Sequence, residues 1–284
     1  MMEYSLGLYE KALPPADDPA TLCRKAAEAG FDRLELSIDE TDARLARLDW
    51  SEAAQGALGL QSREAGAPIR TLCLSGHRKY PLGARDPAVR TRSLEILRKA
   101  IGFAANAGIG IIQLAGYDVY YEPGDASTRA RFREGLGLGA AWAAEAGVVL
   151  AFETMETPFM DTVGKAMAWV REIGSPWLGL YPDIGNLQNA AVKYGHSVTE
   201  DLALGAGHTF ALHLKETRPG VYRDMRFGSG GHTDYSGCLR TALAMGVRLF
   251  TGEFWYHGEE GWEEELRRSN AFLREKIEQA AKTL

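Results

Sequence analysis

Eight short apolar segments recur along the chain, separated by longer segments with helical character. Each is rich in leucine, β-branched or aromatic residues, which is typical of strands that are buried on both faces. The eight segments are 5–9, 33–38, 69–75, 109–116, 148–153, 177–183, 210–215 and 247–253.

The segments between them carry good helix formers and apolar residues at helical spacing, as in 18–30 and 88–108. Several end in a glycine, which a helix favours just after its last turn because glycine readily adopts left-handed backbone angles. We expect such ends at Gly30, Gly108 and Gly147.

This alternation continues at a spacing of about 35 residues with no linker-like break, which predicts a single (β/α)8 TIM barrel over residues 1–284. An open doubly wound sheet is the alternative. That fold leads one to expect a glycine-rich phosphate loop after the first strand, and "LGLYEKALPP" contains neither GxGxxG nor GxxxxGK[ST].

The charge balance and the cysteines exclude several classes of protein. A net charge of −6 and a pI near 5.6 argue against nucleic-acid or anionic-membrane partners, which require a basic surface. Three scattered cysteines without CxxC spacing indicate neither a disulfide framework nor a thiolate zinc site. No segment resembles a signal peptide or a membrane span, so we expect a cytoplasmic protein.

Polar residues close the last four apolar segments: Glu153, Asp183, His213 and Glu253. In a (β/α)8 barrel, the carboxyl ends of the strands form the active face, and consecutive strands are neighbours. Each residue alone has an ordinary explanation, such as a helix cap or a hydrogen-bonded core histidine. Four on consecutive strands predict one cluster.

Three carboxylates and an imidazole in a dry pocket repel one another unless a cation lies between them. We therefore predict one divalent metal ion held by Glu153, Asp183, His213 and Glu253. Oxygen-rich ligands with one nitrogen suit Mn²⁺, Mg²⁺, Co²⁺ or Zn²⁺, and the ligand type alone does not choose among them. We expect Mn²⁺ or Zn²⁺, with Mg²⁺ and Co²⁺ as alternatives.

Five stretches resemble the L-ribulose-5-phosphate 3-epimerase family, also called L-xylulose-5-phosphate 3-epimerases, within the xylose-isomerase-like barrels. The stretches are "GLYEKALP", "SIDETDARLARLDW", "LCLSGHRKYPLG", "IQLAGYDVYY" and "LYPDIGN". The resemblance implies an isomerase of carbohydrate metabolism whose metal ligands are the same four strand-end residues.

The implied reaction is the C3 epimerisation of a ketopentose 5-phosphate, L-xylulose 5-phosphate to L-ribulose 5-phosphate, through an enediolate. Inverting C3 requires acid/base groups on both sides of the sugar, and we expect Glu153 and Glu253 to fill these catalytic roles. We also expect a homodimer.

Two clusters are candidates for binding the phosphate of the small-molecule substrate. The first follows the seventh strand and contains Lys215, Arg218 and the "GSGG" turn with Gly228 and Gly230. Surface solvation is the ordinary explanation for such residues.

The second basic cluster, His77, Arg78 and Lys79, follows the third strand. Ser75 and Gln113, at the ends of the third and fourth strands, are further candidates for substrate contacts.

Alternatives on the same fold are an epimerase or isomerase of an unphosphorylated sugar, and an endonuclease IV-like enzyme, which the single strand-end histidine and the negative charge disfavour. A non-catalytic sugar-phosphate sensor is the alternative from another class.

Overall fold

A computed structural model of the chain describes residues 3–16 and 18–284. Within them, eight parallel strands form one sheet in the order β6-β5-β4-β3-β2-β1-β8-β7. The strands are β1 (Ser5–Tyr9), β2 (Arg33–Ile38), β3 (Ile69–Leu74), β4 (Ile111–Ala115), β5 (Val149–Glu153), β6 (Leu178–Leu180), β7 (Leu212–Leu214) and β8 (Leu249–Gly252).

Backbone hydrogen bonds also join the two ends of that order. Leu180 N donates to His208 O (2.8 Å), Phe210 N donates to Leu180 O (2.9 Å), and His213 N donates to Pro182 O (2.9 Å). The segments of β6 and β7 therefore lie side by side, and the sheet fits the expected (β/α)8 barrel.

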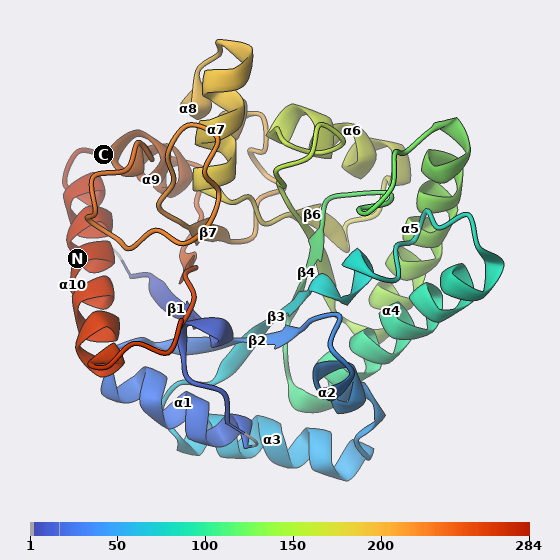
Figure 1. Ribbon diagram of the computed structural model, residues 1–284, viewed down its shortest axis with the longest axis horizontal. Helices are drawn as coiled ribbons and strands as arrows, with labels where there is room; N and C mark the ends of the chain where they lie inside the picture. The colour runs from blue at the N-terminus through green and yellow to red at the C-terminus, as the bar shows by residue number, and fades with distance from the viewer. Residues whose placement is uncertain (1–2, 17) are drawn as a thin grey trace.

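Helices alternate with the strands and lie around the outside of the sheet (Figure 1). The α-helices are α1 (Pro19–Glu28), α2 (Asp42–Leu45), α3 (Glu52–Glu64), α4 (Pro87–Ala107), α5 (Ala126–Ala146), α6 (Val163–Ile173), α7 (Ile184–Tyr194), α8 (Val198–Ala203), α9 (Tyr235–Ala244) and α10 (Trp262–Ala281). Short 3-10 helices are η1 (Glu10–Ala12), η2 (Ala46–Asp49) and η3 (Ser75–Arg78).

The glycines expected just after the ends of three helices are confirmed. Gly30, Gly108 and Gly147 have φ angles of 88°, 72° and 68°, in the left-handed region that glycine enters at little cost. At the other end of the long helices, Asp86 and Asp125 accept hydrogen bonds from free backbone N–H groups of the first turn.

Strands β6 and β7 are shorter than the apolar segments that predicted them. Pro182 lacks an N–H group for a strand ladder, and the next residue, Asp183, already caps α7. The early end of β6 places the carboxylate of Asp183 at the end of the sheet.

The core is a continuous apolar layer between the sheet and the helices. Helix α6, for example, buries Ala166, Met167 and Val170. None of the helices in the described part of the chain combines the length and the apolar character that a membrane crossing requires.

Two helix glycines give a matched test of packing between α3 and α4. A Cβ at Gly59 of α3 would lie 2.2 Å from Ala107 O, whereas a Cβ at Gly102 of α4 meets nothing within 4 Å. We expect Gly59→Ala to lower the free energy of unfolding by about 1–3 kcal/mol through overpacking. Gly102→Ala should raise it by up to about 1 kcal/mol. Urea denaturation of both variants measures this; equal effects would contradict the close approach.

Candidate functional site

The four strand-end residues lie together at the carboxyl ends of β5 to β8. Glu153 is the last residue of β5, Asp183 follows β6, His213 lies within β7, and Glu253 follows β8. One ligand atom from each lies within 4.8 Å of the others, and all four residues are buried. The predicted cluster is therefore present in the structure.

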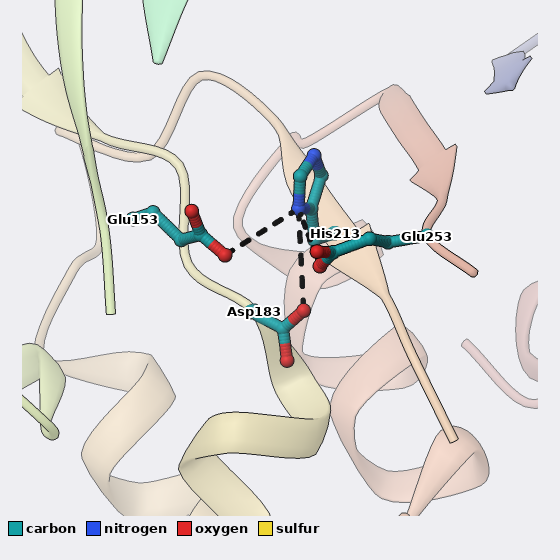
Figure 2. A group of neighbouring side chains, drawn as sticks. All are labelled: Glu153, Asp183, His213 and Glu253. Carbon is teal, nitrogen blue, oxygen red and sulfur yellow. Dashed lines mark hydrogen bonds and ion pairs between the residues drawn. The ribbon is translucent and has the colours of Figure 1, made fainter. Parts of the chain in front are cut away.

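One ring nitrogen of His213 faces the three carboxylates, and the other points away from them (Figure 2). Its Nδ1 atom is 3.0 Å from Glu253 Oε2, 3.7 Å from Glu153 Oε1 and 4.0 Å from Asp183 Oδ2. Glu153 and Glu253 approach from opposite sides in this view. The oxygens thus surround one small volume rather than forming isolated pairs.

Asp183 has two oxygens with different roles. Oδ1 accepts a hydrogen bond from Asn186 N (2.7 Å) and so caps α7. Oδ2 faces the cluster; it is buried and accepts no hydrogen bond within the described residues. A buried carboxylate oxygen without a donor is costly, and a bound cation would satisfy it.

Lys215, directly after β7, places its ammonium beside the same carboxylates. Nζ lies 3.1 Å from Asp183 Oδ2 and 3.3 Å from Glu253 Oε2. The contact with Asp183 is an ion pair without hydrogen-bond geometry, because Oδ2 still has no donor. Lys215 is buried, so its charge acts in a medium of low dielectric constant.

The pKa values reflect the crowding of these groups. Burial, followed by the charge of Glu253, raises the pKa of Glu153. Burial also raises the pKa of Asp183 to about 8, although Lys215 opposes the shift. Burial acts in the same direction on Glu253, but Lys215 and His213 outweigh it and hold its pKa well below the usual value. The protein's own cations therefore do not offset all three carboxylates equally.

The donor set suits a hard or borderline divalent cation. Three carboxylates and one imidazole are ligands typical of Mn²⁺, Zn²⁺, Mg²⁺ or Co²⁺. A spread of 4.8 Å is close to the ~4 Å that separates opposite ligands of an ion with bonds of ~2.1 Å. The cluster could hold a metal ion after small side-chain rotations.

A pocket opens above this cluster. It is lined by Tyr9, Lys11, Cys73, Ser75, Arg78, Ala115, Glu153, Met155, Glu156, Asn186, Lys215, Tyr222, Arg223, Glu253 and Trp255. Glu153 and Glu253 of the cluster line it together with Lys215, and three further cations, Lys11, Arg78 and Arg223, also line it. The pocket is therefore polar and carries both signs of charge.

Ser75, Arg78 and Lys215 are the predicted substrate-binding residues that line this pocket. His77 and Gln113 are buried outside its lining. The Nε2 atom of His77 lies 3.3 Å from Ser93 O, and burial lowers the pKa of His77 to about 4. The Nε2 atom of Gln113 lies 3.1 Å from both ring nitrogens of His213.

The predicted turn after β7 lies outside the pocket lining. Arg218 donates a hydrogen bond to Ser229 O (3.2 Å), and Gly228 and Gly230 adopt φ angles of 74° and 78°. A Cβ at Gly231 would lie 2.1 Å from Glu216 Oε1, so this turn packs closely against a carboxylate of the protein itself.

The sequence prediction missed Arg223 and Glu156, which lie 3.6 Å apart at the pocket. No local pattern marks either residue. It also missed Glu35 on β2, whose Oε1 lies 2.6 Å from His213 Nε2. The "RLELSI" segment did contain a signal, because Arg33, Glu35 and Ser37 share one face of the strand while the other face is apolar.

Comparison with known proteins gives related sequences and related folds. A family model described as "Xylose isomerase-like TIM barrel" matches residues 23–276. Proteins named L-ribulose-5-phosphate 3-epimerase UlaE from Salmonella paratyphi C (strain RKS4594) and Salmonella choleraesuis (strain SC-B67) are each 46% identical over 241 residues, covering 85% of this chain and 83% of theirs.

Solved structures of ketose 3-epimerases share the fold at low sequence identity. D-psicose 3-epimerase from Clostridium cellulolyticum H10, with D-tagatose, has a TM-score of 0.80 at 14% identity and covers 96% of this chain and 99% of its own. An L-ribulose 3-epimerase structure has a TM-score of 0.77 at 17% identity, with coverage of 99% and 96%.

Metal binding can be tested with two buried aspartates that both pair with lysine. Asp183→Asn removes a carboxylate of the cluster and should weaken Mn²⁺ binding by ~100-fold. Removing a residue that only hydrogen-bonds a metal ligand typically costs ~10–100-fold in affinity, and loss of a ligand should cost at least as much. Asp161→Asn changes a buried aspartate that pairs with Lys165 and Lys193 in another part of the fold. It should leave the Kd for Mn²⁺ unchanged in calorimetric titration. Equal Kd values for both variants would contradict a site at Asp183.

Proposed function

This chain belongs to the L-ribulose-5-phosphate 3-epimerase family of the xylose isomerase-like TIM barrels and is an epimerase, and we propose that it interconverts L-xylulose 5-phosphate and L-ribulose 5-phosphate with a divalent metal ion. The observation that carries the proposal is the pocket itself. Glu153 and Glu253, which approach the cluster from opposite sides in Figure 2, both line it, and Arg78 and Arg223 line the same pocket.

Glu153, Asp183, His213 and Glu253 would hold the metal, of which Mn²⁺ and Zn²⁺ are the strongest candidates. When bound, the ion would supply a Lewis acid that polarises the ketose carbonyl and stabilises the charge of the enediolate. The Oδ2 atom of Asp183 supports this assignment, because it accepts no hydrogen bond within the described residues and has only the ion-pair contact with Lys215.

The two glutamates carry the protons. One removes the C3 proton from one face of the sugar, and the other delivers a proton to the opposite face, which inverts the carbon. Each carboxylate has two oxygens, so one can bind the cation while the other faces the substrate.

Lys215 acts at the floor of the pocket rather than at the phosphate. Its ammonium contacts Asp183 and Glu253, so it orients both carboxylates and favours their charged forms. In this position it can also donate a hydrogen bond to a sugar oxygen. Lys215 lines the pocket and Arg218 does not, which supports a division of the first predicted basic cluster into two roles.

The phosphate is bound by the cations that line the pocket without contacting the four-residue cluster: Lys11, Arg78 and Arg223. Arg78 packs over the ring of Tyr120, with 4.8 Å from Cζ to the ring centroid, and Arg223 lies 3.6 Å from Glu156. These contacts hold the guanidinium groups at the pocket, where the two arginines can bind a dianion by donating several hydrogen bonds to its oxygens. The local charge supports a phosphorylated rather than a free sugar.

We further infer that residues 1–284 form one barrel domain, which the alternation of strands and helices supports. Three free, buried thiols support a reducing, cytoplasmic environment. The expected homodimer stays a prediction.

Deuterium exchange tests the reaction and the two-base mechanism together. In D₂O the wild-type enzyme should place deuterium at C3 of both epimers of the pentulose phosphate. Glu153→Gln and Glu253→Gln should each lower kcat by ~10²–10⁴-fold, the usual contribution of an acid/base group. Each variant should still exchange the C3 proton of one epimer, and the two variants should act on opposite epimers, because one base remains in each. NMR at C3 follows both epimers.

Glu156→Gln is the matched control, since Glu156 lines the same pocket outside the four-residue cluster. Its kcat should stay close to that of the wild type. Deuterium at C1 alone would contradict C3 epimerisation and indicate an isomerase. Ligand binding without turnover in the metal-loaded wild type would indicate a sensor.

Phosphate recognition is tested by comparing two arginines. Arg78→Gln should raise KM for the pentulose phosphate by ~10–100-fold, because a hydrogen bond to a charged group is worth about 1.5–3 kcal/mol. Arg218→Gln, at the exposed turn, should leave KM nearly unchanged. Activity on the unphosphorylated ketose should be equal in both variants. A larger increase in KM for Arg218→Gln than for Arg78→Gln would contradict this assignment and place the phosphate site at the turn after β7.

A further inference from the structure

We propose that Glu35, on strand β2, is a positioning residue that fixes the tautomer and orientation of His213 so that Nδ1 faces the carboxylate cluster. This inference deepens the proposed function, because it concerns how the ring becomes a competent metal ligand. Glu35 lies on the opposite side of the ring from the three carboxylates and does not line the pocket.

The two ring nitrogens of His213 face different partners. Nε2 lies 2.6 Å from Glu35 Oε1, and Nδ1 lies 3.0 Å from Glu253 Oε2. An ionised carboxylate only accepts hydrogen bonds, so its partner nitrogen must carry the proton. In the neutral ring this leaves the lone pair on Nδ1, the nitrogen that points into the cluster.

Glu35 is itself held in place through its second oxygen. Thr71 Oγ1 and the Tyr181 hydroxyl each donate to Oε2 at 2.8 Å, which leaves Oε1 for His213. Thr71 is the direct neighbour of Glu35 in the pairing of β2 with β3. The Tyr181 ring also packs edge-on against His213, with centroids 5.0 Å apart. The carboxylate therefore presents one oxygen in one direction.

Arg33 supplies positive charge below this carboxylate in the interior of the sheet. Its Nη1 donates to Thr71 Oγ1 (3.1 Å), and its Nη2 donates to Phe250 O (2.8 Å). A Cβ at Gly7 would lie 2.7 Å from Nη1, so glycine leaves the room that the guanidinium occupies. A fully buried carboxylate requires such compensation to stay ionised.

Other contacts of His213 do not choose between the two nitrogens. Gln113 Nε2 lies 3.1 Å from both of them, and its Oε1 atom accepts no hydrogen bond within the described residues. The contact of Nδ1 with Glu253 Oε2 is compatible with a protonated Nδ1 and, when a cation is bound, with a deprotonated one. Glu35 is therefore the contact that distinguishes the two tautomers.

The test uses Glu35→Gln, because glutamine keeps the shape of the side chain. Its amide can present either the carbonyl oxygen, an acceptor, or the NH₂ group, a donor, to Nε2 of His213. We expect the Kd for Mn²⁺ to rise 10–100-fold, the loss typical when the outer partner of a metal-binding histidine is removed. The ¹⁵N spectrum of the Zn²⁺-loaded protein should show the proton of His213 on Nε2 in the wild type and a mixed population in the variant. A residue that only stabilises the fold would leave this ratio unchanged.

The matched control is Glu10→Gln. Glu10 is also a buried glutamate held by arginines, with Arg47 Nη2 at 2.8 Å and Arg44 Nη1 at 2.7 Å, but it makes no contact with His213. Glu10→Gln should lower the free energy of unfolding and leave the Kd for Mn²⁺ unchanged.

If Glu35→Gln fails to fold, the double variant Thr71→Val with Tyr181→Phe tests the proposal. It removes the two hydrogen bonds to Oε2 of Glu35 and keeps the carboxylate. It should weaken Mn²⁺ binding several-fold.

A folded Glu35→Gln protein with wild-type affinity for Mn²⁺ and an unchanged proton position on His213 would overturn the proposal. Failure of the wild type to bind Mn²⁺ or Zn²⁺ would overturn it as well. A third outcome combines weaker metal binding in Glu35→Gln with a wild type that does not epimerise the sugar phosphate. This outcome would support the role of Glu35 and reject the proposed function. The two conclusions are thus separable.

Discussion

The crowding of three carboxylates around one imidazole is the constraint on which the rest of this structure depends. Glu153, Asp183 and Glu253 come from different strands, and each is removed from water at the carboxyl end of the sheet. Charges of one sign in a dry volume cost several kcal/mol each unless cations or hydrogen bonds offset them. The surrounding residues are best understood as means of offsetting or using that charge.

The offsetting groups come from both sides of the cluster. Lys215 contacts Asp183 and Glu253 from the pocket side, and His213 joins the cluster to the interior of the sheet. Below the histidine, Glu35 and Arg33 extend the network through Thr71. Charges of alternating sign at short distances lower the electrostatic cost of each member, and the many hydrogen bonds restrict each side chain to one orientation. Such restriction is what a catalytic site requires of its ligands.

The same charge separation suits the proposed substrate. A ketopentose phosphate has polar oxygens at one end, which match a metal and its carboxylates, and a dianion at the other, which matches Arg78 and Arg223. In the proposed function, carboxylates would disfavour the phosphate near the cluster and arginines would favour it elsewhere in the pocket, so electrostatics would contribute to the direction of binding. The loops after β3 and β7 supply the arginines, while the strand ends supply the reacting groups. In the proposed function, recognition and chemistry would therefore lie on different parts of the barrel.

The sequence alone determined the strand and helix alternation, the glycine ends of helices, and the four-residue cluster. These features follow from local rules: apolar runs form strands, and neighbouring strands of a parallel barrel bring their carboxyl ends together, so Glu153 and His213 could be placed near each other without coordinates. Only the tertiary structure decided that His77 turns into the core, that Lys215 joins the cluster, and that Arg223 reaches the pocket. It also decided that Glu35 meets His213, although they are 178 positions apart in the chain. Loop paths and side-chain directions depend on packing between distant segments, and no local pattern in the sequence encodes that packing.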